Sequence, residues 1–146
     1  MADQSFTGNG PGRNDSEDRG VPPISGPALV ESCMGNAALV TMVLDRFEQQ
    51  LRGDLDRMER LAVAADWAHL AMASHGLKGA AGAVSAMALH GAATRVEGAS
   101  HAQDPAGVLA AIAGLRLEID RCLRFIPELR DEFRGGAGGE GRGHVA

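Results

Sequence analysis

Residues 104–126 read DPAGVLAAIAGLRLEIDRCLRFI, and this stretch decides the fold. Its large apolar residues recur at steps of four and three, which is the spacing of one face of an α-helix. Asp104 followed by Pro105 marks the helix start, because aspartate caps a first turn and proline suits the first helical position. We therefore expect a helix from Pro105 that Pro127 kinks or stops. Its apolar seam consists of Val108, Ile112, Leu115, Ile119, Cys122 and Ile126.

Three earlier segments have the same helical periodicity. Asn36 is the expected N-cap of a long helix and Asp66 that of the next one, while a further helix is expected to end between residues 98 and 101. Ahead of these, a short helix is expected from Pro27 through Met34, with Gly35 as its stop. The apolar positions are Val40, Leu44, Phe47, Leu51, Leu55, Met58 and Leu61 in the first segment, Trp67, Leu70, Leu77 and Val84 in the second, and Leu89, Ala93 and Val96 in the third.

The composition agrees with an all-helical fold. The chain has no Tyr, one Trp and four Phe, whereas β architecture draws on aromatic and β-branched residues. We expect an all-α protein, an antiparallel four-helix bundle with a short additional N-terminal helix, over residues 27–133. Residues 1–26 and 134–146 are rich in Gly and polar residues and poor in large apolar ones. They are predicted to be a disordered leader and a disordered Gly-rich tail.

Length and charge exclude several classes of protein. The chain has 146 residues, and 14 basic against 19 acidic side chains give a net charge of -5. An acidic chain without a basic cluster is not expected to bind nucleic acid, and no apolar run is long enough to span a membrane. Cys33 and Cys122 lack metal-ligand spacing and are interpreted as reduced core thiols. We expect a cytoplasmic monomer.

The helix after Asp66 carries a histidine on its polar side. On a projection at about 100° per residue, His75 lies opposite Leu77 and Val84. Lys78, the only lysine in the chain, follows one turn later. The rest of this side is small, with one sizeable apolar residue: it holds Ala68, Ala71, Gly79, Gly82 and Met72.

Glycines inside a helix need an explanation, because each costs about 1 kcal/mol relative to alanine. Gly76, Gly79 and Gly82 together cost on the order of 3 kcal/mol. Close packing of a neighbouring helix would place them inward, but Gly79 and Gly82 share the side of His75. The alternative interpretation is that a bulky partner must reach the imidazole.

Phosphoryl transfer suits such an imidazole. Free imidazole, with a pKa of about 6.5, is mostly neutral at pH 7 and offers a lone pair to phosphorus. A phosphorylated side chain carries roughly two negative charges, and Lys78 can offer an ammonium group to them. The other requirements of phosphoryl transfer, a metal and acidic groups, are expected from the partner.

Residues 74–86, SHGLKGAAGAVSA, resemble the signature of histidine-containing phosphotransfer (HPt) domains. That signature combines His, an aliphatic residue, Lys, Gly and a run of small residues, which here begins with His75, Leu77 and Lys78. The resemblance continues in the pair Val96-Glu97 and covers about residues 27–133. The chain departs from it at Gly76, where the family often has Thr or Ser. It departs again at Ser85, where the family often has Gly.

The resemblance implies a phosphoryl carrier rather than an enzyme. His75 would accept the phosphoryl group from the aspartyl-phosphate of a response-regulator receiver domain and pass it to another receiver. Lys78 would stabilise the phosphate, and Ala68, Ala71, Met72, Gly79 and Gly82 would face the partner. No cofactor is expected on this chain, and Mg²⁺ is expected on the receiver only. A hybrid sensor histidine kinase is a further candidate partner.

Three alternatives compete with this prediction. A protein of the same fold could dock on receivers or kinases without transferring phosphate, or the chain could be a plain helical interaction module. A di-iron bundle needs Glu-x-x-His pairs, and every Glu in this chain lacks a His three positions later. The presence of both His75 and Lys78 favours phosphotransfer.

Overall fold

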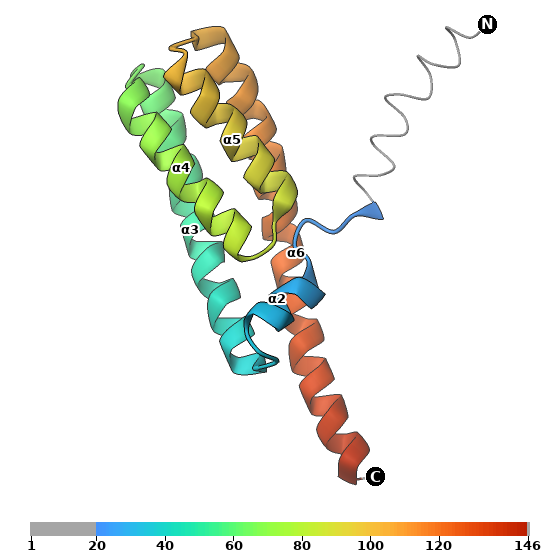
Figure 1. The fold of residues 1–146 in the computed structure, drawn as a ribbon. Helices are drawn as coiled ribbons and strands as arrows, with labels where there is room; N and C mark the ends of the chain where they lie inside the picture. The colour runs from blue at the N-terminus through green and yellow to red at the C-terminus, as the bar shows by residue number, and fades with distance from the viewer. Residues whose placement is uncertain (1–19, 146) are drawn as a thin grey trace, which may run out of the picture.

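The computed structural model describes residues 20–145, and side chains for residues 20–134. Its helices are α2 (Gly26–Ser32), α3 (Ala37–Val63), α4 (Trp67–Ala83), α5 (Met87–His101) and α6 (Pro105–Val145), and this part of the chain has no strand. Consecutive helices from α3 to α6 run in opposite directions (Figure 1). The predicted all-α bundle with a short additional N-terminal helix is confirmed.

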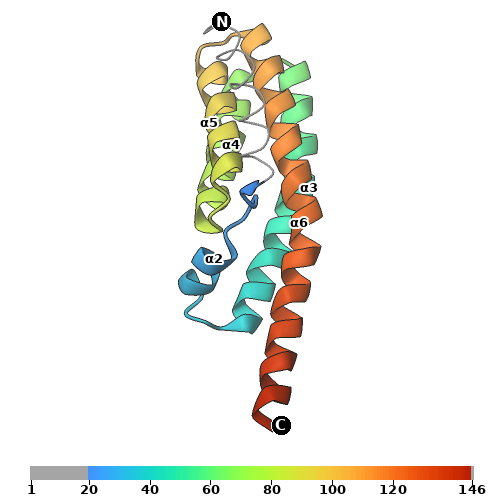
Figure 2. The same cartoon turned by 90° about the vertical axis from the view of Figure 1, so that its right-hand side faces the viewer.

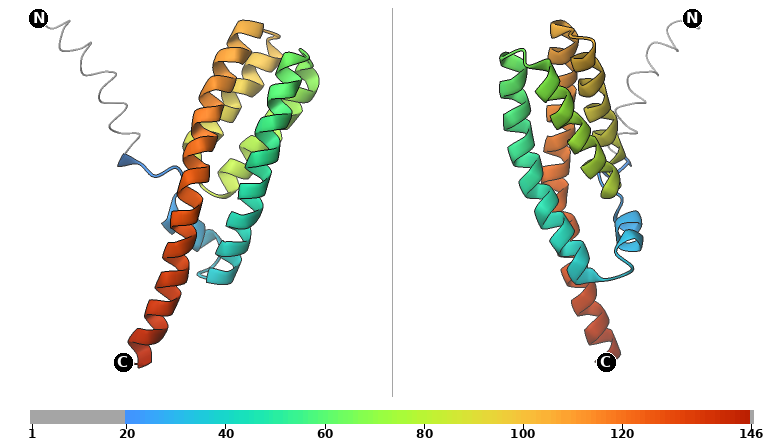
Figure 3. Two further views of the ribbon diagram at one scale, coloured as in Figure 1. Left: turned by 180° about the vertical axis from the view of Figure 1, so that it is seen from behind. Right: turned by 60° about the vertical axis from the view of Figure 1, so that its left-hand side comes forward.

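The bundle is built from two long and two short helices. α3 and α6 run side by side, and α4 packs closely along α5 (Figure 3). α2 lies beyond the lower ends of α4 and α5, beside the first turns of α3 (Figure 2). α2 therefore covers neither the upper turns of α4 nor the outer side of the α4–α5 pair.

The predicted caps form. Asn36 accepts a hydrogen bond from the Leu39 backbone N–H at 3.0 Å, and Asp66 accepts one from the His69 backbone N–H at 3.3 Å. Gly35 has a φ of +75°, in the left-handed region that suits a residue just after a helix. These local bonds fix where α3 and α4 begin.

The predicted apolar stripes form one core. All six seam residues of α6 from Val108 to Ile126 are at most 5% exposed. On α3, Leu55 and Leu61 are only partly buried, and the other five stripe positions are buried. On α4, at its C-cap and on α5, Trp67 is only partly buried and the other predicted positions are buried: Leu70, Leu77, Val84, Leu89, Ala93 and Val96.

The start of the packed segment differs from the prediction. Ile24 is fully buried, and the Ser25 hydroxyl caps α2 by accepting a bond from the Ala28 backbone N–H at 3.2 Å. The predicted boundary between residues 26 and 27 therefore falls inside the packed segment. The predicted extent of the first helix was also wrong, because α2 ends at Ser32 and Met34 is 88% exposed. The leader over residues 1–19 lies outside the described residues, so its disorder stays a prediction.

The other end of the chain also differs. Pro127 does not stop α6, which continues to Val145. A proline inside a helix costs about 3 kcal/mol, but Ile126 and Leu129 beside it are buried, and burial of two such side chains offsets a cost of this size. The backbone of residues 134–145 continues the helix where a disordered tail is predicted. No single helix in the described chain is long and apolar enough to cross a membrane.

All four turns between α2 and α6 contain a non-glycine residue in the left-handed conformation. The φ angles are +54° for Met34, +55° for Ala65, +59° for Ser85 and +53° for Gln103. A residue with a side chain costs roughly 1–2 kcal/mol in that conformation, and glycine does not. At position 85, where the family often has Gly, this chain therefore has a residue that suits the left-handed conformation less well.

Candidate functional site

His75 projects from the middle of α4 into solvent. Its side chain is 68% exposed, while Leu70 and Leu77 on the opposite face of the helix are fully buried. Ser74 before it is buried and donates its hydroxyl proton to the Leu70 carbonyl at 2.7 Å. The packing of α4 therefore fixes the base of the histidine and leaves its ring accessible, as the helical projection predicts.

A carboxylate from the neighbouring helix holds the imidazole. Glu97 on α5 places Oε2 3.1 Å from Nδ1 of His75 and Oε1 3.0 Å from Nζ of Lys78. The carboxylate side chain is only 17% exposed. An ionised carboxylate can only accept, so Nδ1 of His75 donates and Nε2 is left facing away with its lone pair. The contact thus selects the nitrogen that can react.

The charges at this site favour an ionised carboxylate. The hydrogen bond from the Lys78 ammonium lowers the pKa of Glu97 most, the hydrogen bond from His75 lowers it further, and partial burial opposes both. The Lys78 side chain is 26% exposed, so its stem lies along the helices and its charged end reaches Glu97. In this structure Lys78 is a partner of Glu97, and its contact with a phosphate stays a prediction.

The glycines beside His75 face open space. A Cβ atom added at Gly76 or Gly79 would meet nothing within 4 Å, and one at Gly82 would meet His90 at an ordinary contact distance of 3.5 Å. Close packing of a neighbouring helix therefore does not explain Gly76 and Gly79. Their small size leaves room for something outside this chain.

Two of the other predicted partner-facing residues are exposed and one is not. Ala68 is exposed and Met72 is 68% exposed, but Ala71 is only 5% exposed. The assignment of Ala71 to the open face was wrong, because α5 covers that side of α4. Ala71 instead lines an open hollow of about 430 Å³ between the two helices, which Glu97 and His101 also border.

Comparison with known proteins identifies the family of this chain. A family model described as the Hpt domain matches residues 42–125, which is 84 of the 146 residues. The chain belongs to the Hpt domain family. No curated protein matches it, and no solved structure matches it. Hpt domains are phosphocarrier modules of phosphorelays and interact with response-regulator receiver domains, so a histidine phosphotransfer role follows from membership.

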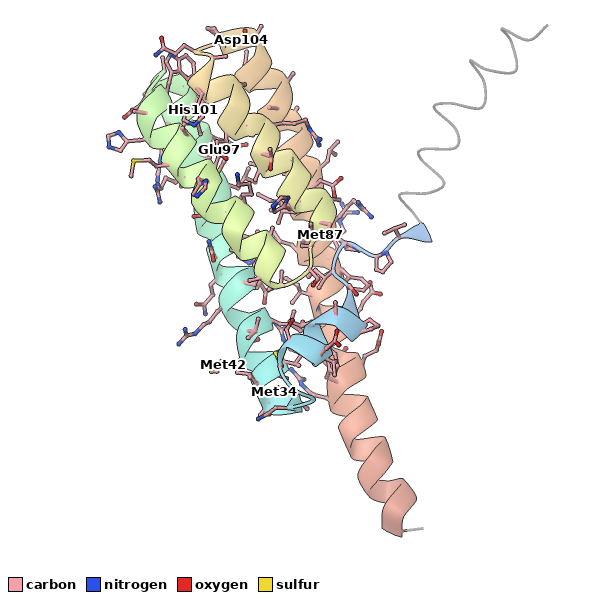
Figure 4. All side chains as sticks on the ribbon, viewed as in Figure 1. Met34, Met42, Met87, Glu97, His101 and Asp104 are labelled. Carbon is pink, nitrogen blue, oxygen red and sulfur yellow. The ribbon has the colours of Figure 1, made fainter. Side chains whose placement is uncertain are left out.

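Two residues of this Hpt site were not predicted as site residues. Glu97 was noted only within the Val96-Glu97 pair, and His101 only as the last residue of the range in which its helix was expected to end. The side chains of Glu97 and His101 lie one helical turn apart on α5, over its seam with α4 (Figure 4). The Val96-Glu97 pair was the signal that could have identified Glu97. Among the side chains that the structure describes, no group of three or more His, Cys, Asp or Glu could hold a metal ion.

Proposed function

We propose that His75 is the residue that carries the phosphoryl group, and that it exchanges this group with the aspartyl-phosphate of receiver domains. The observation that carries the proposal is the pairing of an exposed ring with a carboxylate on one nitrogen only. Nε2 is free to attack, and the glycines leave the approach to it open.

The transfer step uses few groups of this chain. The Nε2 lone pair attacks phosphorus, the bond between phosphorus and the aspartate oxygen breaks, and the aspartate leaves as a carboxylate. Nδ1 keeps its proton, so the phosphorylated ring carries a positive charge that Glu97 faces at 3.1 Å. A carboxylate beside that N–H stabilises the charged ring and fixes its orientation, as in other histidine–carboxylate pairs. Lys78 is assigned to the phosphoryl oxygens, with a swing of its ammonium away from Glu97.

The proposal keeps Mg²⁺ on the receiver and gives this chain no cofactor. A chelator should therefore stop transfer between the two proteins, because the metal neutralises charge on the receiver's phosphoryl group. The lifetime of phosphohistidine on the isolated, already phosphorylated chain should be unchanged by the chelator. A chelator-dependent loss of phosphate from the isolated chain would contradict this assignment.

The deciding experiment mixes the chain with phosphorylated receivers and searches for an acid-labile, base-stable phosphate. We expect label on the wild type and on Lys78→Ala, the latter transferring more slowly, and none on His75→Ala. Helical content by circular dichroism should be equal in all three, since both side chains lie outside the core. Label that persists in His75→Ala refutes the assignment. Binding of receivers without any phosphohistidine would instead make the chain a docking regulator.

A further inference from the structure

The Glu97 carboxylate has a third basic neighbour in His101, beside His75 and Lys78. Nε2 of His101 lies 3.7 Å from Oε2 of Glu97, the same oxygen that accepts the hydrogen bond from Nδ1 of His75. Within the described chain, the groups that pair with this carboxylate within 4.0 Å are His75, Lys78 and His101. His101 is the one among them that neither reacts nor is assigned to the phosphate.

Phosphorylation of His75 changes the charged groups that the Lys78 ammonium can contact. In the free protein it holds Oε1 of Glu97 at 3.0 Å. A phosphoryl group on His75 adds roughly two negative charges one helical turn from Lys78. As the ammonium turns to these oxygens, Glu97 loses its closest charged partner while a second anion stands beside it. Like charges at such spacing repel, and the repulsion disfavours the phosphorylated form.

We propose that His101 is a positioning residue of the phosphoryl site, which takes over the Glu97 carboxylate when Lys78 turns to the phosphoryl group. This inference rests on the proposed function. Closing the gap of 3.7 Å to hydrogen-bond distance needs only a small rotation, and the His101 side chain is 67% exposed and therefore free to make it. In this role His101 neutralises the charge of the Glu97 carboxylate and keeps the carboxylate in place against Nδ1 of His75.

The position of His101 on α5 favours this role. It lies four residues after Glu97, and an acidic residue four positions ahead of a basic one is the better order for a pair on a helix. It is also the last residue of α5, where the helix dipole stabilises a positive charge. The sequence order and the helix end both suit a contact between His101 and the Glu97 carboxylate.

The test measures how much of His75 is phosphorylated at equilibrium. Phosphoramidate serves as donor: its phosphorus–nitrogen bond breaks, the bond to Nε2 forms and ammonia leaves. At a fixed ratio of phosphoramidate to ammonium, phosphorus NMR gives the amount of phosphohistidine, and comparison with the total protein concentration gives the ratio of phosphorylated to free His75. We expect His101→Gln to lower that ratio about two- to five-fold, the size expected for a partly exposed ion pair. His101→Lys, which keeps a cation, should restore it.

Two further variants separate this role from a structural one. His90→Gln makes the same change two turns before Glu97 on α5, about 10 Å from Glu97 along the helix, and should leave the ratio at the wild-type value. In a Glu97→Gln background, His101→Gln should have no effect, because the carboxylate that it neutralises is gone. A wild-type ratio in His101→Gln, or an equal loss in both backgrounds, overturns the inference. Absence of phosphohistidine from the wild type, with phosphoramidate and with receivers, would instead overturn the proposed function.

Discussion

Replacing the Glu97 carboxylate by an amide should change which nitrogen of His75 carries the proton. In the wild type the carboxylate accepts from Nδ1 at 3.1 Å and cannot donate, so it stabilises only the tautomer with a free Nε2. In Glu97→Gln the amide can accept or donate, and both tautomers find a partner. The variant should therefore contain more of the tautomer whose reactive nitrogen is blocked by a proton.

The size of this effect follows from the exposure of the ring. A hydrogen bond to a charged group contributes about 1.5–3 kcal/mol when it is protected from water. The His75 side chain is 68% exposed, so solvent screening reduces the value to about 0.5–1 kcal/mol. The tautomer ratio should change about two- to five-fold as a result. Proton–nitrogen correlation NMR of the imidazole rings at about pH 8, where free imidazole is neutral, measures that ratio directly.

The chain offers a matched control for this measurement. Nδ1 of His69 lies 2.9 Å from the Asp66 carboxylate, in a second histidine–carboxylate pair on the first turn of α4. Asp66→Asn should change the ring nitrogens of His69 and leave those of His75 as they are. If Glu97→Gln leaves the ring nitrogens of His75 unchanged while the control responds, Glu97 does not set the tautomer and the argument for Nε2 is wrong.

Four further outcomes are expected from the structure. Gly79→Ala should raise the free energy of unfolding by about 1 kcal/mol and slow transfer slightly, whereas Gly79→Trp should keep its helicity and block transfer; normal transfer in Gly79→Trp would refute the argument that small residues keep the approach to His75 open. Ser85→Gly should raise the free energy of unfolding by about 1 kcal/mol, because glycine adopts the left-handed conformation without strain, and an unchanged denaturation midpoint would contradict the strain. The hydrogen bond from Arg130 lowers the pKa of Glu48, so Glu48→Gln should cost stability above the ordinary glutamate pKa of about 4.3, and the difference in chemical denaturation should vanish as the pH falls through the lowered pKa. Burial raises the pKa of the Cys122 thiol to about 12, so a thiol reagent should modify it only in denaturant, and fast labelling of this thiol in the native protein would be the contrary result.

Local signals in the sequence predicted the helices and the reactive histidine. Caps such as Asn36 and Asp66 bond to the backbone three residues later, so neighbouring residues decide them. The exposure of His75 likewise follows from the spacing of Leu70 and Leu77 on its own helix. None of these features needs knowledge of how the helices pack.

The errors arise where two helices meet. Ala71 was placed on the open face because a single projection allows for one buried stripe, but α4 packs against both α3 and α5 and its buried arc is wider. The contact of Glu97 with His75 joins residues 22 positions apart on two helices. Its formation depends on the register of α5 against α4, which periodicity does not determine. Ile24 was missed because one apolar residue in a polar segment has no period.

The packing of α4 in the bundle, which brings Glu97 to His75, also stabilises α4 as a helix. Gly76, Gly79 and Gly82 together weaken the intrinsic helix by about 3 kcal/mol, and most of the stability of a helix in a folded protein comes from the packing of its apolar face. Burial of Leu70 and Leu77 contributes about 1.5–3 kcal/mol each, which offsets the deficit only while α4 is packed in the bundle. The open surface needed for a partner and the stability of the helix that bears it are therefore supplied by opposite faces of α4. Mutations that loosen the core behind Leu77 should therefore disturb the contact between Glu97 and His75 first. The His75 ring stays exposed to solvent even in the unfolded chain, whereas the contact needs α4 and α5 to be packed together.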